Sequence, residues 1–235
     1  MDSVRESLIV TESLKKDYVE GGVVVPAVRG IDLRIDPGEF TAIVGPSGSG
    51  KTTFLNLISG LDSPTEGKVW LRDHLISDLS GSELSDVRRD HIGFIFQAYN
   101  LIPVLTVKEN IEYIMLLQGV PDRERAARVA AILKEIGMEG FERRFPPKIS
   151  GGQQQRVAIA RAMVSRPELI LADEPTANLD SETGAELLDM MHDLNHRLGM
   201  TFLFSTHDKM VMERADRVIT LHDGRVAEDE WRVPH

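Results

Sequence analysis

The stretch Gly45-Pro46-Ser47-Gly48-Ser49-Gly50-Lys51-Thr52 matches the phosphate-binding pattern GxxxxGK[ST] at every fixed position. The apolar run Phe40 to Val44 before it predicts a short strand, and Thr52 to Ile58 after it predicts a helix. Glycines allow backbone N–H groups to approach phosphate oxygens, and the helix N-terminus adds a partial positive charge. The sequence therefore predicts a P-loop, because a glycine- and serine-rich turn before a helix would not need all these matches.

The P-loop assigns chemical roles to individual residues. Lys51 should reach the β- and γ-phosphates of a nucleotide, and the Thr52 hydroxyl should bind Mg²⁺. The nucleotide-binding candidates in this region are Gly45, Pro46, Ser47, Gly48, Ser49, Gly50, Lys51, Thr52 and Thr53.

Length and composition limit the class of protein. A chain of 235 residues is long enough for one large α/β domain. With 27 basic and 37 acidic residues the net charge is −10, so binding to nucleic acid through a broad basic surface is not expected. Cysteine is absent, which excludes disulfides and thiolate zinc sites. Met1 to Val10 is charged and no apolar run approaches about 18 residues, so we expect a cytoplasmic protein without direct membrane insertion.

The N-terminal part of the chain predicts strands. Leu8 to Tyr18 and Ala27 to Ile35 read as two strands, separated by a loop that contains Gly21-Gly22 and Pro26. Tyr18 is either a half-buried strand aromatic or a platform on which a nucleotide base stacks, and the residues alone leave both open. Further along, Ser82 is predicted to cap the start of a helix.

The middle of the chain predicts a helical insert of approximately residues 98–165. A strand ending at Gln97 precedes an apolar loop, Ala98 to Pro103, which is either tucked under a neighbour or offered to a partner. Thr106 to Met138 is helical in its periodicity, with no strand-like run to interrupt it. A further helix begins at Ser150, whose hydroxyl suits the N-cap position, and runs to about Ser165.

Acidic and histidine side chains follow two later strands. Asp173 and Glu174 end the strand that begins at Leu169, and His207 follows the strand Thr201 to Ser205. Carboxyl ends of parallel strands meet at the edge where such sheets bind ligands. Asp173 would hold Mg²⁺ through a water molecule, Glu174 would polarise the attacking water, and His207 would contact the γ-phosphate and hold Glu174 in place. A solvated loop is the alternative for the acidic pair, and a structural role is the alternative for the histidine.

Ser150, Gly151, Gly152 and Gln153 form a second candidate anion site at the start of a helix. That helix has about 15 residues and spans roughly 22 Å before the chain returns to Asp173, which must lie beside Lys51. Ser150 should therefore lie far from its own P-loop. The sequence predicts a head-to-tail dimer in which this site contacts the nucleotide of a second copy.

Two histidines, His192 and His196, are four residues apart in the predicted helix Ser181 to Leu198, as in the HExxH zinc pattern. Asp193 stands where that pattern has glutamate, and no third ligand is evident. We therefore expect both histidines to be surface residues that bind no metal. After them, Arg217 to Leu221 and Arg225 to Ala227 predict a closing hairpin.

Taken together, these motifs resemble the ATP-binding subunits of ABC transporters over nearly the whole chain. In that family's terms, residues 45–52 are the Walker A loop, Ser150 to Gln153 the signature, and Leu169 to Glu174 the Walker B strand. Ile149 stands where the signature usually has leucine, a conservative apolar exchange outside the phosphate contacts.

The resemblance extends to residues that local reasoning leaves undecided. Gln97 matches the Q-loop glutamine, Asn178-Leu179-Asp180 the D-loop, and His207 the switch histidine, and Tyr18 is implied to stack on adenine. The implied catalytic residues are Glu174, His207, Gln97 and Lys51, and the implied Mg²⁺ ligands are Thr52, Gln97 and Asp173. Asp180 and the signature residues are implied to contact the nucleotide of the second copy.

The resemblance also implies an architecture and partners. The expected fold is an α/β P-loop NTPase with a mixed sheet core, an antiparallel β subdomain and an inserted α-helical subdomain, in one domain spanning 1–235. ATP and Mg²⁺ are the expected cofactors, and an integral membrane permease and a second copy are the expected partners. The protein is then expected on the cytoplasmic face of the inner membrane, bound peripherally.

Phe96 to Pro103 and Gln153 to Arg161 are similar to the lipoprotein-releasing and macrolide-efflux branch of the family, which moves lipoprotein, peptide or drug-type cargo. A soluble ABC ATPase of DNA repair or translation is the alternative, but it usually has two cassettes or a long coiled-coil insert. A P-loop kinase or simple nucleotide-binding module would have no use for the signature or for His207.

Overall fold

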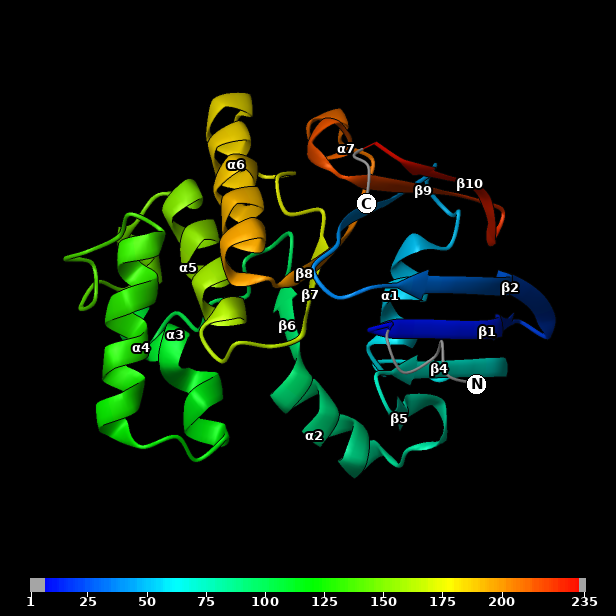
Figure 1. Ribbon diagram of the computed structural model, residues 1–235, viewed down its shortest axis with the longest axis horizontal. Coiled ribbons are helices and arrows are strands. Elements are labelled where there is room, and N and C mark those ends of the chain that lie inside the picture. The colour runs from blue at the N-terminus through cyan, green and yellow to red at the C-terminus, as the bar shows by residue number, and fades with distance from the viewer. Residues whose placement is uncertain (1–6, 233–235) are drawn as a thin grey trace.

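The computed structural model describes residues 7–232 (Figure 1). Residues 1–6, which belong to the charged segment Met1 to Val10, and residues 233–235 lie outside the described part of the chain. Among the residues that are described, no helix combines the length and apolar character that a bilayer span requires.

A six-stranded mixed sheet forms the centre of the molecule, with strand order β10-β9-β3-β8-β7-β6. The neighbouring pairs from β9 to β6 are parallel, and only β10 runs antiparallel to its neighbour β9. The strands are β3 (Phe40–Val44), β6 (Ile92–Ile95), β7 (Leu169–Asp173), β8 (Thr201–Thr206), β9 (Arg217–His222) and β10 (Arg225–Trp231). Because β3, β7 and β8 are parallel neighbours, the P-loop, Asp173 and His207 follow strand ends at the same edge of the sheet.

A second, antiparallel sheet has the order β2-β1-β4-β5. Its strands are β1 (Ile9–Glu20), β2 (Val23–Ile35), β4 (Glu66–Leu71) and β5 (His74–Leu75). The predicted loop around Pro26 is wrong, because β2 begins at Val23 and Pro26 pairs with Asp17. Proline is tolerated there because β2 is an edge strand, whose outer side has no neighbour that needs a proline N–H.

Helix α1 (Lys51–Ile58) lies between the two sheets (Figure 1). Its buried residues, which include Phe54 and Leu57, pack with Ile9 and Leu71 of the antiparallel sheet and with Ile43 of the mixed sheet. The helix that follows the P-loop is therefore held by apolar contacts on both sides.

Helix α2 (Gly81–His91) begins two residues before the predicted start. Its N-cap is Ser80 and not Ser82, because the Ser80 hydroxyl accepts the Glu83 N–H while the Glu83 carboxylate accepts the Ser80 N–H. This reciprocal capping box satisfies two backbone groups, which a cap at Ser82 could not do with the same glutamate.

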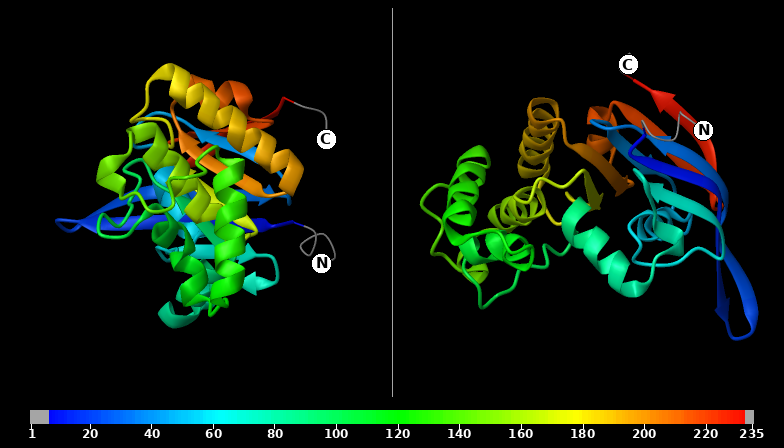
Figure 2. Two further views of the ribbon diagram at one scale, coloured as in Figure 1. Left: turned by 90° about the vertical axis from the view of Figure 1, so that its left-hand side faces the viewer. Right: turned by 60° about the horizontal axis from the view of Figure 1, so that its bottom comes forward.

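The chain between β6 and β7 is helical, and its helices gather at one end of the molecule (Figures 1 and 2). The predicted helical stretch Thr106 to Met138 consists of two helices, because Gly119 adopts a φ of 73° and Pro121 precedes the second. The helices of this region are α3 (Val107–Leu117), α4 (Asp122–Glu135) and α5 (Gly151–Met163), with the 3-10 turn η3 (Pro146–Lys148).

The remaining helices are α6 (Ser181–Leu198) and α7 (Lys209–Arg214), with the 3-10 turn η2 (Ile76–Asp78) after β5. A continuous apolar cluster joins the helical region to the mixed sheet, through residues such as Met115, Leu133, Ile159 and Phe204. The mixed sheet, the antiparallel strands and the helices between β6 and β7 confirm the predicted fold class.

Candidate nucleotide-binding and hydrolysis site

The P-loop joins β3 to α1, and neighbouring backbone segments pack closely against two of its glycines. A Cβ atom at Gly45 would lie 2.2 Å from the Leu221 carbonyl oxygen, and one at Gly50 would lie 2.5 Å from the Ala27 carbonyl oxygen. Gly50 has a φ of 99°, which side chains disfavour. The loop therefore requires glycine at both positions for close approach.

Three features of the P-loop fit an anionic group. No side chain caps the N-terminus of α1, and no acidic residue lies in its first turn. The Ser49 hydroxyl is buried without a hydrogen-bond partner, which is uncommon for a buried polar atom. The Lys51 Nζ donates to the carbonyl oxygens of Gly45 (2.8 Å) and Pro46 (3.1 Å), so the ammonium group folds back over the loop. These donors match the requirements of bound phosphate oxygens.

Glu174 directly follows β7 and contacts Thr206, the last residue of β8, and His207, which comes after it. Its Oε1 is 2.6 Å from His207 Nδ1, and its Oε2 accepts a hydrogen bond from the Thr206 hydroxyl (2.8 Å). The Glu174 backbone adopts a left-handed φ of 47°, and its N–H donates to the Ser205 carbonyl. This uncommon conformation for a non-glycine residue holds the carboxylate against β8.

Asp173 lies beside Glu174 and shares a small cavity of about 40 Å³ with Thr52 and Phe96. Burial raises the pKa of the Asp173 carboxyl, and the neighbouring Glu174 raises it further. The Ser205 hydroxyl, which bonds to this carboxyl, and Lys51 lower the same pKa. The structure thus brings Thr52 and Asp173, predicted as metal ligands, to one place.

Gln97 follows β6, and its side chain is exposed. Its backbone carbonyl accepts a hydrogen bond from the Asn178 side chain (2.8 Å), which ties the segment after β6 to the loop that leads to Asp180. The segment after Gln97 is fixed by Arg161 of α5, which donates to the carbonyls of Asn100 and Tyr99.

Tyr18 lies near the end of β1 and is half-buried. Its hydroxyl donates to the Asp62 carboxylate (2.8 Å), and the Lys16 Nζ lies 5.1 Å from the ring centroid. Burial and the bond to Asp62 raise the pKa of the Tyr18 hydroxyl, and a contact with Thr53 lowers it. The ring therefore lies beside the helix that follows the P-loop.

Ser150 caps α5 in a capping box with Gln153. The neighbours of this turn come from other loops: a Cβ atom at Gly151 would lie 3.0 Å from the Tyr99 hydroxyl, and one at Gly152 would lie 2.6 Å from the Thr183 methyl group. Ser150 is exposed, and none of these contacts belongs to the P-loop.

Asp180 caps α6. Its carboxylate accepts the Thr183 N–H (2.9 Å) and the Thr183 hydroxyl (2.8 Å), and these bonds hold the pKa of the Asp180 carboxyl below its ordinary value. Asp180 therefore lies near the signature turn, because Thr183 also touches Gly152.

Two residues of the site escaped the sequence analysis. Thr206 carries no motif of its own, and only its position in front of His207 could have indicated it. Arg161 reaches two carbonyls at residues with left-handed backbone, Tyr99 (φ 59°) and Asn100 (φ 49°). A left-handed backbone is hard to predict from the sequence when the residue is not glycine.

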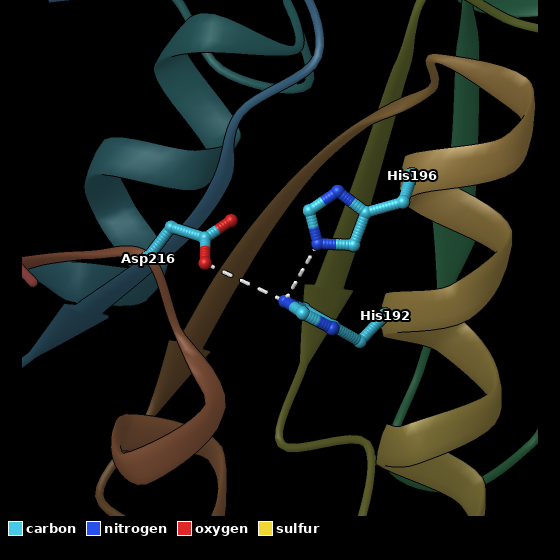
Figure 3. Close-up of side chains that lie close together, drawn as sticks. All are labelled: His192, His196 and Asp216. Carbon is cyan, nitrogen blue, oxygen red and sulfur yellow. Dashed lines mark hydrogen bonds and ion pairs between the residues drawn. The ribbon is translucent and has the colours of Figure 1, made fainter. Parts of the chain in front are cut away.

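The prediction that both histidines are surface residues is confirmed for His196, which is exposed, and is wrong for His192, which is half-buried. The His192 and Phe40 rings pack edge to face, with their centroids 4.9 Å apart. A third potential ligand is present, because Asp216, the residue before β9, lies 3.4 Å from His192 Nε2 (Figure 3).

Comparisons with known proteins agree with this site. The family described as ABC transporter matches residues 28–177, which include the P-loop, the signature turn and Glu174. The lipoprotein-releasing system ATP-binding protein LolD of Anaeromyxobacter dehalogenans is 41% identical over 97% of this chain and 96% of its own length. The macrolide export ATP-binding/permease protein MacB of Sodalis glossinidius is 43% identical over 94% of this chain, which corresponds to 34% of MacB.

A solved structure shows the same fold. The ATP-binding cassette MJ0796, known from Methanocaldococcus jannaschii, was determined as a dimer in a post-hydrolysis state bound to ADP and Pi. It superimposes with a TM-score of 0.87 and 42% identity, and covers 97% of this chain and 100% of that one. Because the family match spans more than half of the residues and the relatives align along nearly the whole sequence, the chain belongs to the ABC transporter family, as one of its ATP-binding and ATP-hydrolysing subunits.

Proposed function

We propose that this subunit powers a membrane permease of the lipoprotein-releasing and macrolide-efflux type, by closing as a head-to-tail homodimer around two ATP molecules. The observation that carries the proposal is the separation of two half-sites on one chain. The P-loop and Glu174 share one edge of the mixed sheet, while Ser150 is exposed among Tyr99 and Thr183 at the helical end. We also infer that the helical insert, approximately residues 98–165, is the part of the domain that carries the second half-site.

Residues of the first half-site bind the nucleotide. Tyr18 stacks on adenine, and its hydrogen bond to Asp62 supports this role because the bond fixes the ring plane. The backbone of residues 45–53 surrounds the phosphates, and Lys51 releases its two loop carbonyls to bind them instead. Such an exchange replaces neutral acceptors with a charged one, which favours the bound state.

Thr52, Gln97 and Asp173 would hold Mg²⁺. Their hydroxyl, amide and carboxylate oxygens are the donors that this ion prefers, and the shared cavity of Thr52 and Asp173 supports their joint use. Bound there, the ion neutralises charge on the β- and γ-phosphates. The raised pKa of Asp173 is consistent with a carboxylate prepared for a cation, because the nearby positive charge would restore its ionised form.

Glu174 acts as the general base for the attacking water. Thr206 and His207 hold its two oxygens, so the carboxylate has a fixed direction. As an imidazolium, which has two N–H donors, His207 can donate to Glu174 through Nδ1 and to a γ-phosphate oxygen through Nε2. In the closed dimer, the signature residues and Asp180 of the second copy complete the site, and the N-terminus of α5 faces the γ-phosphate.

An apolar surface near Gln97 supports a membrane-protein partner. Ile102, Val104 and, on α3, Tyr113, Leu116 and Leu117 are exposed. A neighbouring cavity of about 330 Å³ is lined by Phe94, Phe96 and Ile114 among others. Leu101 does not belong to this surface, because it packs against the larger core cluster. We propose that a cytoplasmic element of the permease binds here, which places the subunit peripherally on the cytoplasmic face of the membrane.

Val104→Glu tests the partner surface, since Val104 is 79% exposed and its replacement leaves the core intact. We expect ATP hydrolysis by the isolated subunit to be unchanged. Assembly with the membrane protein encoded in the adjacent reading frame should weaken by about tenfold or more, as a buried unpaired charge would cause. Co-purification and ATPase rates of the reconstituted complex measure both effects.

The matched control is Val24→Glu, which places the same charge at an exposed valine of the antiparallel sheet. It should leave assembly and both rates unchanged. Normal assembly of the Val104→Glu protein would contradict the proposed surface. Absence of any stable membrane partner would favour a soluble ABC ATPase.

A further inference from the structure

Three side chains that can bind metals converge where the C-terminal part of α6 meets the residue before β9 (Figure 3). His192 Nε2 lies 3.2 Å from His196 Nε2 and 3.4 Å from the Asp216 Oδ1. All three ligand atoms lie within 4.8 Å of one another. The cluster takes no part in the nucleotide site, whose residues follow the opposite ends of β3 and β7.

Hydrogen bonding alone does not satisfy this cluster. If the proton of His192 is on Nε2 and points to Asp216, the same nitrogen cannot also accept from His196, so the two ring nitrogens compete for one proton. If the proton is on His196 Nε2, the bare His192 nitrogen faces a carboxylate oxygen at 3.4 Å, and two acceptors repel. A cation between them would use all three lone pairs, because neutral imidazole and carboxylate are both metal ligands.

The distances match tetrahedral coordination. Bonds of about 2.0–2.1 Å to a tetrahedral ion place neighbouring ligand atoms about 3.3 Å apart. The two measured separations, 3.2 and 3.4 Å, lie on either side of this value. The ligand atoms of the third pair, His196 and Asp216, lie within 4.8 Å of each other and would approach by side-chain rotation when an ion binds. The fourth position faces solvent on the side of His196, which is exposed.

The surrounding structure fixes the ligands in place. The His192 ring packs edge-on against Phe40, with centroids 4.9 Å apart and an interplanar angle of 90°. The Asp216 N–H donates to the Phe40 carbonyl (2.9 Å), and the Asp216 carbonyl accepts from Arg232 N–H (2.7 Å). The spacing of four residues on α6 places both histidines on one face of the helix.

The electrostatic environment leaves Asp216 available. Within residues 7–232, its carboxylate makes no ion pair with a lysine or arginine. The arginines that flank Asp216 in the sequence are paired elsewhere. Arg214 pairs with Asp189, and Arg217 pairs with Glu39 and Asp229. Two imidazoles with one carboxylate favour zinc and similar borderline ions over Mg²⁺ or Ca²⁺, which prefer oxygen ligands.

We propose that His192, His196 and Asp216 form a zinc-type metal site that binds the C-terminal part of α6 to the residue before β9. The ion completes its coordination with water. Such a bond would connect the helix that begins after Asp180 to Phe40, the first residue of the P-loop strand. The site is structural in character, because its ligands lie away from Glu174 and Lys51.

Metal binding to the untagged full-length chain tests the site. Zn²⁺ titration in the absence of nucleotide should give one ion per chain, with a higher melting temperature. Co²⁺ should give the intense visible absorption of a tetrahedral complex. His196→Ala should weaken Zn²⁺ binding by about tenfold or more and abolish the shift in melting temperature. This variant should fold normally because His196 is exposed.

His74→Ala is the matched control, since His74 and His91 also face each other next to Glu168, but with ring centroids 5.4 Å apart. It should bind Zn²⁺ as the wild type does. Asp216→Asn keeps the side-chain shape and should lose the Co²⁺ spectrum. Equal Zn²⁺ binding by wild type and His196→Ala would overturn the proposal, as would no binding by the wild type. If Glu174 and His207 bind the zinc instead, wild type and His196→Ala should bind Zn²⁺ equally.

Discussion

Two helix N-termini in this molecule are suited to phosphate groups, yet they differ in nearly every contact. The N-terminus of α1 begins at a glycine without a side-chain cap, and backbone carbonyls of Leu221 and Ala27 enclose its loop. The N-terminus of α5 is capped by Ser150 and Gln153 and is exposed. The N–H groups at the start of α1 have no side-chain partner until a ligand binds. Those at the start of α5 already have side-chain partners, and this exposed turn can contact a ligand that is bound to another chain.

Glu174→Gln should have the largest effect on this pair of half-sites. The variant keeps the shape and hydrogen bonds of the side chain but cannot accept the proton of water. We expect hydrolysis to fall by about 10³-fold, while ATP binding to the P-loop persists. The two half-sites should then remain closed around ATP as a dimer, measured by light scattering with ATP and Mg²⁺.

The control for charge is Glu228→Gln on β10, where the glutamate is exposed and belongs to none of the nucleotide-binding motifs. It should hydrolyse ATP as the wild type does and remain monomeric after turnover. Normal turnover in Glu174→Gln would contradict the role of Glu174 as general base.

Ser150→Arg should reduce hydrolysis less than Glu174→Gln does, but it separates the role of the signature turn from that of the P-loop. The long side chain would fill the space before α5 and leave the P-loop untouched. Hydrolysis should fall by about 10²-fold, as after the loss of an anion-stabilising group. Nucleotide binding to the monomer, measured by fluorescence titration, should stay at the wild-type level.

Ser82→Arg serves as the reference, because Ser82 is exposed on α2 and its replacement adds the same charge. An equal loss of monomer binding in Ser150→Arg would mean that the signature contacts the nucleotide of its own chain. The distinction between the two half-sites would then disappear.

Asp173→Asn should have the smallest effect, which we expect on stability. This variant should gain stability, whereas the two variants above lose activity. Folding raises the pKa of Asp173, so the protonated form stabilises the fold at low pH and this contribution is lost as pH rises through the raised pKa. The neutral asparagine avoids that loss. At neutral pH without nucleotide or Mg²⁺, we expect a gain on the order of 1 kcal/mol, or about 2–4 °C in melting temperature.

The gain in melting temperature should shrink at acid pH, where the wild-type carboxyl is itself protonated. Asp73→Asn, at an exposed aspartate, should leave the melting temperature unchanged. A lower melting temperature of Asp173→Asn at neutral pH would show that the ionised carboxylate stabilises the free protein.

Much of the fold was predictable from the sequence because local signals and tertiary packing agree. The run Phe40–Val44 is fully buried, and Ser181–Leu198 is bounded by an aspartate cap and a glycine, so both have the predicted limits. Pro26 misled the prediction of β2 because its strand position depends on a vacant sheet edge. Ser80 was missed because Ser82 has the same local chemistry, and only the partner Glu83 distinguishes them.

The site was predictable where a motif names its residues and unpredictable where distant segments meet. The sequence places Asp173 and Glu174 after one strand and His207 after another, and the parallel pairing of β7 with β8 brings them together. Thr206 and Asp216 have no motif, because their importance comes from neighbours 32 and 24 residues away along the chain. Such contacts follow from topology and not from local spacing.

The hydrogen bonds of Arg161 have a mechanical consequence. One guanidinium on α5 grips two successive carbonyls after Gln97, and burial lowers its pKa without removing its charge at physiological pH. Separating these groups would deprive the Arg161 guanidinium of both acceptors, so we expect the signature helix and the segment after Gln97 to move together. We therefore expect a displacement of the segment after Gln97 to move Ser150 at the start of α5, so that Arg161 couples a partner bound at this segment to the second half-site.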